Sequence, residues 1–118
     1  TPTIVLKDGK PFYITGSPGG STIITVVLQS VLNVVEFDMN SLGAIAVPRM
    51  HHQWMPDMIM LEEGVSVDTK NILVDMGHQM APPQYKSTIG ELSSIMLKNG
   101  IMYGAADPRS MDAAAIGY

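Results

Sequence analysis

The stretch GSPGGSTIITVVLQSVLNVVEF, residues 16–37, decides how the rest of this 118-residue chain is arranged. Its first six residues are too rich in Gly and Pro to continue a strand, and they lead into an apolar segment. We predict a helix from Ser21 to Phe37, because its polar residues fall three or four apart and form one narrow stripe. They are Thr22, Thr25, Gln29 and Asn33. A helix that is apolar around most of its circumference is expected to be buried on more than one side.

A β-hairpin is predicted immediately before this stretch. Residues 3–7 are rich in β-branched side chains, Asp8-Gly9 is a strong turn signal, and residues 11–15 return as a second strand. Successive side chains of a strand point to opposite faces. The second strand therefore presents Phe12 and Ile14 on one face, and Tyr13 and Thr15 on the other.

Downstream, the patterns predict two further helices, a strand between them and a closing hairpin. The first expected elements are a helix over residues 41–47, capped by Asn40 and ended by Pro48, then an irregular segment over 49–56 and a strand over 58–62. A helix over 67–76 follows, capped by Ser66 and ended by Gly77, and then a loop over 78–87. The last elements are strands over 93–98 and 101–105 around Asn99-Gly100, and a polar tail over 107–118. This order predicts a single domain, residues 1–118, of the α/β (α+β) class, with helices layered on a mainly antiparallel sheet.

Composition argues against several classes of function. Apolar residues make up 46% of the chain, which is too many for a disordered tail, and Cys is absent, which excludes disulfides and thiolate chemistry. The net charge is −4, from 7 basic and 11 acidic residues, and no segment concentrates Lys and Arg, so we expect no nucleic-acid partner. The longest apolar run, residues 23–35, is too short to span a bilayer, and we expect no membrane partner.

The candidates for a metal site are weak. The 10 Met residues are scattered, so we expect them to fill the core rather than to bind copper. His51 and His52 are adjacent, and adjacent side chains diverge on either a strand or a helix. We expect structural roles for both, packed with Trp54. Asp57 and the distant His78 are the other available ligands, and we therefore expect no metal and no cofactor.

The Gly-rich loop at residues 16–21 is the segment best suited to chemistry. Gly allows a sharp turn close to a ligand, and free N–H groups at a helix start favour negative charge. A Walker loop would need Lys after Gly20, and the dinucleotide pattern is absent too. Ser17 lacks the Gly spacing of a nucleophile elbow. Two interpretations stay open: an oxyanion hole formed by the N–H groups of Gly19 and Gly20, or a tight turn without a ligand.

Four segments stand in this order along the chain: TPTIVLKDGKPF, TGSPGGSTIIT, the Pro-Arg and His-His-Gln-Trp of VPRMHHQWMPD, and YGAADPRS before a terminal GY. Together they resemble gamma-glutamyltransferase, in the C-terminal part of its small catalytic subunit. The resemblance covers nearly the whole chain. It implies one part of the four-layer α-β-β-α sandwich of N-terminal-nucleophile hydrolases, made from a precursor that cleaves itself into two subunits.

The resemblance also implies an activity. The family's N-terminal Thr, with its own amine as the usual base, attacks the γ-glutamyl amide of glutathione and related γ-glutamyl compounds. A γ-glutamyl-enzyme forms and passes its acyl group to water, an amino acid or a peptide. The family's Gly-Gly pair matches Gly19 and Gly20, and it supplies the oxyanion hole that contacts the substrate. By its resemblance to bacterial members, we expect the protein to be periplasmic or extracellular.

Thr1 does not match the nucleophile of the family. It matches the residue before the Pro of the first strand, and the family's nucleophile is followed by Thr-His rather than by Pro2. The nucleophile, a pair of Ser residues and other substrate-binding residues lie upstream or on the large subunit. We therefore expect this chain to hold one part of a composite active site, with the large subunit and the upstream part of the small subunit as its partners.

Other interpretations remain. Within the family, the whole protein could be an acylase acting on a cephalosporin side chain or a transpeptidase acting on poly-γ-glutamate. Outside enzymology, the chain could be an inactive structural or interaction fragment. Asp107 and Arg109 flank Pro108 and could form either a buried ion pair or a solvated turn, and the resemblance implies a structural role for this motif.

Overall fold

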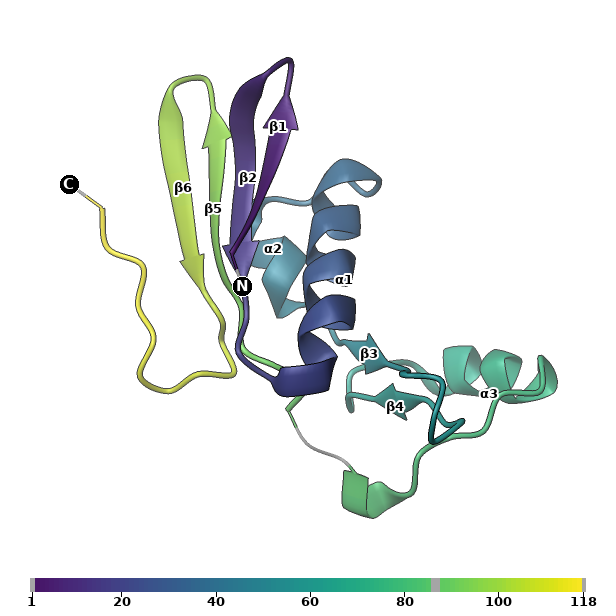
Figure 1. Ribbon diagram of the computed structural model, residues 1–118. Helices are drawn as coiled ribbons and strands as arrows, with labels where there is room; N and C mark the ends of the chain where they lie inside the picture. The colour runs from purple at the N-terminus through teal and green to yellow at the C-terminus, as the bar shows by residue number, and fades with distance from the viewer. Residues whose placement is uncertain (1, 86–87, 118) are drawn as a thin grey trace.

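The computed structural model describes residues 2–85 and 88–117. Figure 1 shows a four-stranded sheet with two helices packed on one face and a smaller lobe beside it. The elements are β1 (Thr3–Lys7), β2 (Lys10–Gly16), the 3-10 turn η1 (Gly20–Thr22), α1 (Ile23–Val35), α2 (Ser41–Ala46), β3 (Met50–His51), β4 (Met60–Leu61), α3 (Val67–Asp75), the 3-10 turn η2 (Pro83–Tyr85), β5 (Ser93–Lys98) and β6 (Ile101–Ala106). The predicted mixed class with antiparallel strands is confirmed.

The sheet joins the two ends of the chain. Its strand order is β1-β2-β5-β6, and every neighbouring pair is antiparallel. Both predicted hairpins are present, and their turns use a pair of residues with positive φ, Asp8-Gly9 and Asn99-Gly100. The β2–β5 pair sets Thr15 opposite Ser94, which lie 79 positions apart by number (94 − 15). This pairing brings the end of β2, where the Gly-rich loop starts, beside the start of β5.

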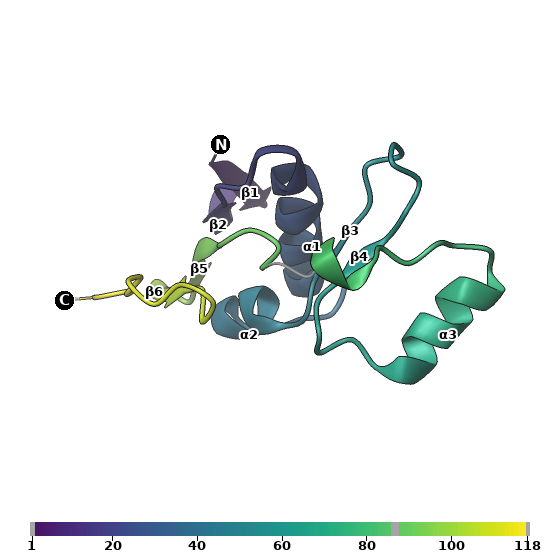
Figure 2. The same cartoon turned by 90° about the horizontal axis from the view of Figure 1, so that it is seen from below.

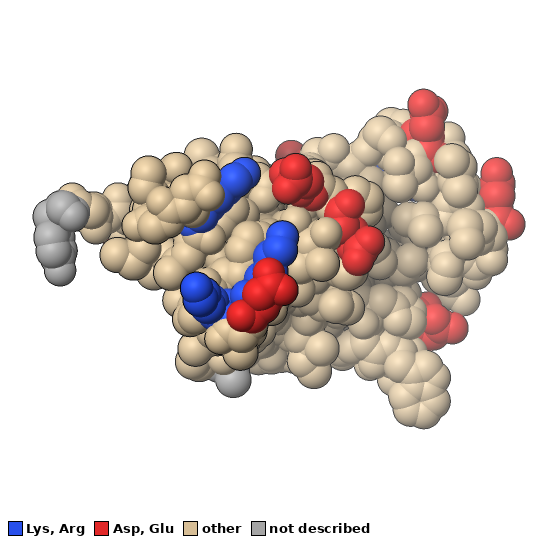
Figure 3. All heavy atoms as spheres, turned by 90° about the horizontal axis from the view of Figure 1, so that it is seen from above, with Lys and Arg blue, Asp and Glu red and all other residues tan. Residues whose placement is uncertain are grey.

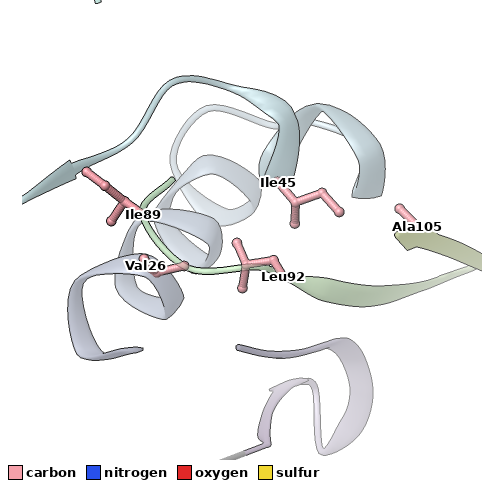
Figure 4. Close-up of a cluster of buried hydrophobic side chains, with 5 residues drawn as sticks. All are labelled: Val26, Ile45, Ile89, Leu92 and Ala105. Atoms are coloured by element: carbon pink, nitrogen blue, oxygen red, sulfur yellow. The ribbon is translucent and has the colours of Figure 1, made fainter. Parts of the chain in front are cut away.

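The core lies between the sheet and helices α1 and α2. Figure 4 shows one cluster of buried side chains, which comes from α1, α2, the segment before β5 and β6: Val26, Ile45, Ile89, Leu92 and Ala105. A second cluster contains Tyr13, Val34, Ala44 and Met96. Tyr13 and Thr15 face this core, as the alternation of β2 predicted. The Tyr13 hydroxyl is satisfied by the Ser30 hydroxyl at 2.6 Å.

Helix α1 is shorter and more exposed than the sequence predicted. It begins at Ile23 after the η1 turn, and it ends at Val35. The predicted burial on more than one side is wrong for this chain, because Ile24 is 76% exposed and Leu28 is 53% exposed on the face away from the sheet. The polar stripe makes side-chain bonds to neighbouring segments: Thr25 to His51, Gln29 to Met50, and Asn33 to Ala44.

The opposite face of the sheet is apolar and open. Side chains that point away from the helices include Ile4, Leu6, Ile95 and Met102, all of them exposed. The prediction that Met residues fill the core is only partly right: Met39 and Met60 pack against the core clusters, but five of the ten Met residues are exposed. Met96 is buried, whereas Met55, Met76, Met102 and Met111 are each more than 60% exposed. These long apolar side chains lie on surfaces that the chain does not cover by itself.

The lobe contains β3, β4, α3 and η2, and it lies to one side of the sheet and α1 (Figure 2). The strand predicted over 58–62 is shorter in the structure, where β4 covers only Met60–Leu61. The segment predicted as irregular over 49–56 contains the short strand β3. Both predicted N-caps are confirmed: the Asn40 side chain accepts from the Gly43 N–H, and that of Ser66 from the Thr69 N–H. Residues 86–87 of the predicted loop lie outside the described residues. No helix in the described part of the chain is both long and apolar enough to span a membrane.

Candidate functional site: the glycine loop and its support

The Gly-rich loop leaves β2 and enters α1 through the η1 turn. Gly19 and Gly20 both have positive φ, at 136° and 58°, which side-chain-bearing residues adopt at a cost. A Cβ on Gly19 would lie 2.5 Å from the Thr22 hydroxyl oxygen, whereas a Cβ on Gly20 would meet nothing within 4 Å. Gly19 is therefore required by both backbone conformation and contact, and Gly20 by conformation alone.

The two glycines present adjacent N–H groups at the start of the helix. Among the hydrogen bonds of the described residues, neither the Gly19 N–H nor the Gly20 N–H donates to another group of the chain. The carbonyls of the same loop are instead occupied. The Ser17 hydroxyl donates to the Pro18 carbonyl at 2.5 Å, and the Thr22 N–H and hydroxyl donate to the Gly19 carbonyl at 3.2 and 2.9 Å. Such a pair of N–H groups can receive an anion or a developing oxyanion.

The segment before β5 supports this loop from the core side. The Glu91 N–H donates to the Ser17 hydroxyl oxygen at 3.1 Å. Gly90 fits tightly against the loop, since a Cβ there would lie 2.8 Å from the Ser17 hydroxyl oxygen and 3.2 Å from a Val26 methyl. The loop is thus held by residues more than 70 positions away in the sequence.

A buried network of four charged side chains holds the supporting segment: Arg49, Glu62, Asp107 and Arg109. Arg49 donates to the carbonyls of Ile89 and Gly90, both at 2.9 Å, and it forms an ion pair with Asp107. Asp107 also accepts from the Leu92 N–H at 2.7 Å. The alternative of a solvated turn at Asp107 is excluded, because this side chain is 1% exposed.

Arg109 completes the network at its outer edge. It donates to Glu62 at 2.5 Å and to Asp107 at 3.1 Å. Glu62 in turn accepts from the N–H groups of Arg49 and Ile89, at 2.9 and 3.1 Å. Two positive and two negative charges therefore balance inside the chain. Other charged side chains lie at the surface, where both signs are visible on the face that carries the hairpin turns (Figure 3).

The two acids of the network are ionised at neutral pH. Burial raises the pKa of Asp107, but hydrogen bonds from the Leu92 N–H and from Arg49 outweigh burial and hold this pKa below its ordinary value. Burial likewise raises the pKa of Glu62, but bonds from Arg109 and from the Ile89 N–H lower it overall. Burial lowers the pKa of Arg109, yet its two carboxylate partners raise it overall. The network is thus a set of full charges.

The histidines lie in the lobe and point apart. His51 is buried, with Nδ1 at 2.7 Å from the Thr25 hydroxyl oxygen, whereas His52 lies at the surface, 3.1 Å from Asp57. The predicted packing of the histidines against Trp54 is wrong, because that side chain is 78% exposed. Residues 2–85 and 88–117 contain no cluster of three or more metal-ligating side chains.

Comparison with known proteins shows which family this chain resembles in sequence and fold. The family model for gamma-glutamyltranspeptidase matches residues 1–117. The chain is 48% identical over 119 residues to a glutathione hydrolase proenzyme of Escherichia coli (strain K12), covering 100% of this chain and 20% of the relative. Its fold matches a solved gamma-glutamyltranspeptidase T380A mutant of Helicobacter pylori with a TM-score of 0.85 and 43% identity, covering 93% of this chain and 60% of that one.

More distant structures share the fold alone. A cephalosporin acylase from Bacillus halodurans matches with a TM-score of 0.84 at 24% identity, covering 99% of this chain and 22% of that one. The layered sheet and helices are therefore those of an N-terminal-nucleophile hydrolase. Within that class, the chain belongs to the gamma-glutamyltranspeptidase family. It spans about a fifth of the length of the curated relatives it matches.

Sequence reasoning found the loop but missed its support. Gly19 and Gly20 lie side by side at the start of η1, the turn that leads into α1, in the loop that the pattern predicted. The sequence analysis does not predict that Arg49 and Glu62 support this loop through the segment before β5. The sequence contains a weak signal: Arg49 lies between Pro48 and Met50, and Glu62 follows the apolar residues 59–61, and a charge that such a segment buries requires a partner. The partner itself could not be identified from spacing.

Proposed function

We propose that this chain is part of a gamma-glutamyltransferase that cleaves the γ-glutamyl amide of glutathione and related γ-glutamyl compounds. In this proposal, Gly19 and Gly20 form the oxyanion hole. The proposal depends on one observation above all: two adjacent N–H groups at a helix start are left without an acceptor in the described chain, while the carbonyls beside them are bonded. Membership of the family supports the same assignment.

The chemistry explains why such donors are needed. When a hydroxyl attacks the amide carbonyl, a C–O bond forms and negative charge collects on the former carbonyl oxygen. Collapse of this intermediate breaks the C–N bond and expels the amine, which carries away the proton that the hydroxyl lost, and a γ-glutamyl ester remains on the enzyme. Water, an amino acid or a peptide then attacks this ester, receives the γ-glutamyl group and releases the hydroxyl. Two preorganised N–H groups stabilise the charge each time it forms, and loss of one such donor lowers the rate by about 10²–10³.

The nucleophile and the groups that bind the substrate carboxylate come, in this proposal, from the large subunit and the upstream part of the small subunit. The open apolar face of the sheet supports such partners. Ile4 and Leu6 of β1 are each more than half exposed there, and Ile95 and Met102 continue the face across β5 and β6. A second sheet packed on this face would complete a four-layer sandwich. A periplasmic or extracellular location is proposed by analogy with bacterial relatives, and cell fractionation would test it.

The decisive experiment compares the intact protein with the 118-residue chain alone. We expect the intact protein to release glutamate from glutathione, and to release the amine from a γ-glutamyl anilide. We expect the chain alone to be inert and, with its apolar faces open, to self-associate. Enzyme-like turnover by the chain alone, abolished by Thr1→Ala, would show that the nucleophile has been misplaced.

The same assay separates the related activities. The intact protein is given glutathione, an amide of a cephalosporin side chain and poly-γ-glutamate in parallel. We expect the highest kcat/KM with glutathione. A clear preference for either of the other substrates would assign the protein to an acylase or to a polymer transpeptidase. Inactivity of a processed, folded protein toward all three would favour a structural or interaction role.

A further inference from the structure

We propose that Ser17 and Thr22 are positioning residues, whose hydroxyls orient the Gly19 and Gly20 N–H groups through the carbonyls that share their peptide planes. This inference rests on the proposed function, because it concerns how the oxyanion hole is set. It adds two side chains that do not contact the substrate.

The argument starts from the planarity of the peptide bond. The Pro18 carbonyl and the Gly19 N–H belong to one rigid unit, and in a trans peptide they point in opposite directions. A hydrogen bond that fixes the carbonyl oxygen therefore fixes the direction of the N–H. The Gly19 carbonyl and the Gly20 N–H form the next unit, and the same relation holds. Gly19 adjoins the first unit, and the second unit lies between Gly19 and Gly20, so both units can rotate unless something holds them.

Ser17 holds the first unit. Its hydroxyl donates to the Pro18 carbonyl at 2.5 Å and accepts from the Glu91 N–H at 3.1 Å, so both the proton and a lone pair are in use. The residue is 5% exposed, and Gly90 packs against its hydroxyl. The hydroxyl cannot swing away to water. It fixes the first peptide plane relative to a segment that Arg49 anchors through the Gly90 carbonyl.

Thr22 holds the second unit. Its hydroxyl donates to the Gly19 carbonyl at 2.9 Å, and its N–H donates to the same oxygen at 3.2 Å. Because the backbone bond remains when the hydroxyl is removed, the hydroxyl of Thr22 should matter less than that of Ser17. Together the two hydroxyls explain how a Gly-Gly pair, the most flexible dipeptide available, can present preorganised donors.

The test uses Ser17→Ala in the intact, processed protein, with kinetics expressed per processed active site. We expect kcat to fall by roughly 10- to 100-fold, which is less than the fall expected when an oxyanion donor is removed completely. We expect KM to change by less than about threefold. Thr22→Val should lower kcat by about three- to tenfold, and Thr22→Ser, which keeps the hydroxyl, should restore it. Ser21→Ala is the matched control, because Ser21 is an exposed hydroxyl in the same loop; it should leave kcat unchanged.

A second measurement separates positioning from mere stability. A boronic-acid analogue of the γ-glutamyl group becomes tetrahedral on the nucleophile and carries its charge where the oxyanion forms. Across the variants, its affinity should fall in parallel with kcat/KM, whereas the affinity for a product such as glutamate should not. A lowered melting temperature with unchanged kcat and boronate affinity would overturn the inference.

The outcomes also distinguish this inference from the proposed function. If Gly20→Ala lowers kcat strongly but Ser17→Ala and Thr22→Val do not, the oxyanion hole stands and the positioning role is wrong. If none of the three changes affects kcat, the oxyanion assignment itself is wrong. If the Ser17→Ala protein fails to fold or to process itself, the kinetics of Thr22→Val and Thr22→Ser test the positioning role instead. Thr22 is less buried than Ser17, so its substitution should disturb folding less.

Discussion

The sheet end of the molecule, which carries the glycine loop, and the lobe are held together by different forces. At the sheet, the loop that carries the glycines rests on a segment bonded to a buried ion pair, Arg49–Asp107, whose side chains are 3% and 1% exposed. In the lobe, α3 buries none of its residues, and the contact between His52 and Asp57 involves a carboxylate that is open to water. The contrast shows that tightly satisfied polar contacts are concentrated where a backbone loop must be held still. The lobe presents surface that other parts of the protein can cover.

Asp107→Asn should give the largest effect. The substitution keeps the shape of the side chain but leaves the buried Arg49 guanidinium without its counter-charge. Breaking one half of a buried pair costs about 3–5 kcal/mol. We expect the melting temperature of the intact protein to fall sharply, as measured by calorimetry. A change of less than 1 °C would contradict the idea that this network holds the sheet end together.

Gly20→Ala should separate function from folding at the same end. The barrier to acylation should rise by about 3–4 kcal/mol if the Gly20 N–H is displaced from the oxyanion. The stability cost should be about 1 kcal/mol, arising from the positive φ, because the space around Gly20 in this chain is open. Steady-state kinetics beside a melting curve checks both values. Wild-type turnover with a lowered melting temperature would mean that the loop is only a turn.

Gly19→Ala provides the internal comparison for that experiment. A Cβ on Gly19 would lie 2.5 Å from the Thr22 hydroxyl oxygen, so this variant must displace that hydroxyl from its bond to the Gly19 carbonyl as well as strain the backbone. We expect it to lose more stability than Gly20→Ala. Equal melting temperatures for the two variants would contradict the loop geometry described above.

Acid should weaken the sheet end of the molecule, where Asp107 and Glu62 lie in the charged network. The pKa values of Asp107 and Glu62 are lowered in the folded protein, from ordinary values of 3.8 and 4.5. Their contribution to stability is therefore complete above these ordinary values, and it is lost as the pH falls through the lower folded values. We expect the urea midpoint of unfolding to be steady from pH 7 to about 5 and to drop below about pH 4. In Asp107→Asn this drop should be smaller, and an unchanged drop would exclude Asp107 as a source.

Asp57→Asn should give the smallest effect, although it is the same substitution as at Asp107. The carboxylate of Asp57 is 76% exposed, so water screens its pairing with His52. Exposed pairs of this kind contribute well under 1 kcal/mol. Calorimetry under the conditions used for Asp107→Asn provides the matched measurement. A loss as large as that of Asp107→Asn would remove the distinction between the two regions.

Features that depend on a few neighbouring residues follow from the amino-acid sequence alone. Asp8-Gly9 and Asn99-Gly100 set their hairpin turns because these residues adopt positive φ readily. Asn40 and Ser66 cap their helices because their side chains reach N–H groups three residues ahead. Gly19 and Gly20 could be recognised for the same local reason, and four collinear motifs indicated the family.

The surroundings of these features depend on contacts between distant segments of the folded chain. The partners of Arg49 lie up to 58 positions away, and the bond from the Glu91 N–H to Ser17 spans 74 positions, so no spacing rule relates them. The local pattern also predicts α1 between two layers and the Met residues in the core. Such a pattern reports how apolar a side chain is, but it does not report which surface covers that side chain. Burial and pairing are properties of contacts between distant segments. They are fixed only when the β2–β5 pairing closes the sheet and brings the Gly loop against the segment that holds it.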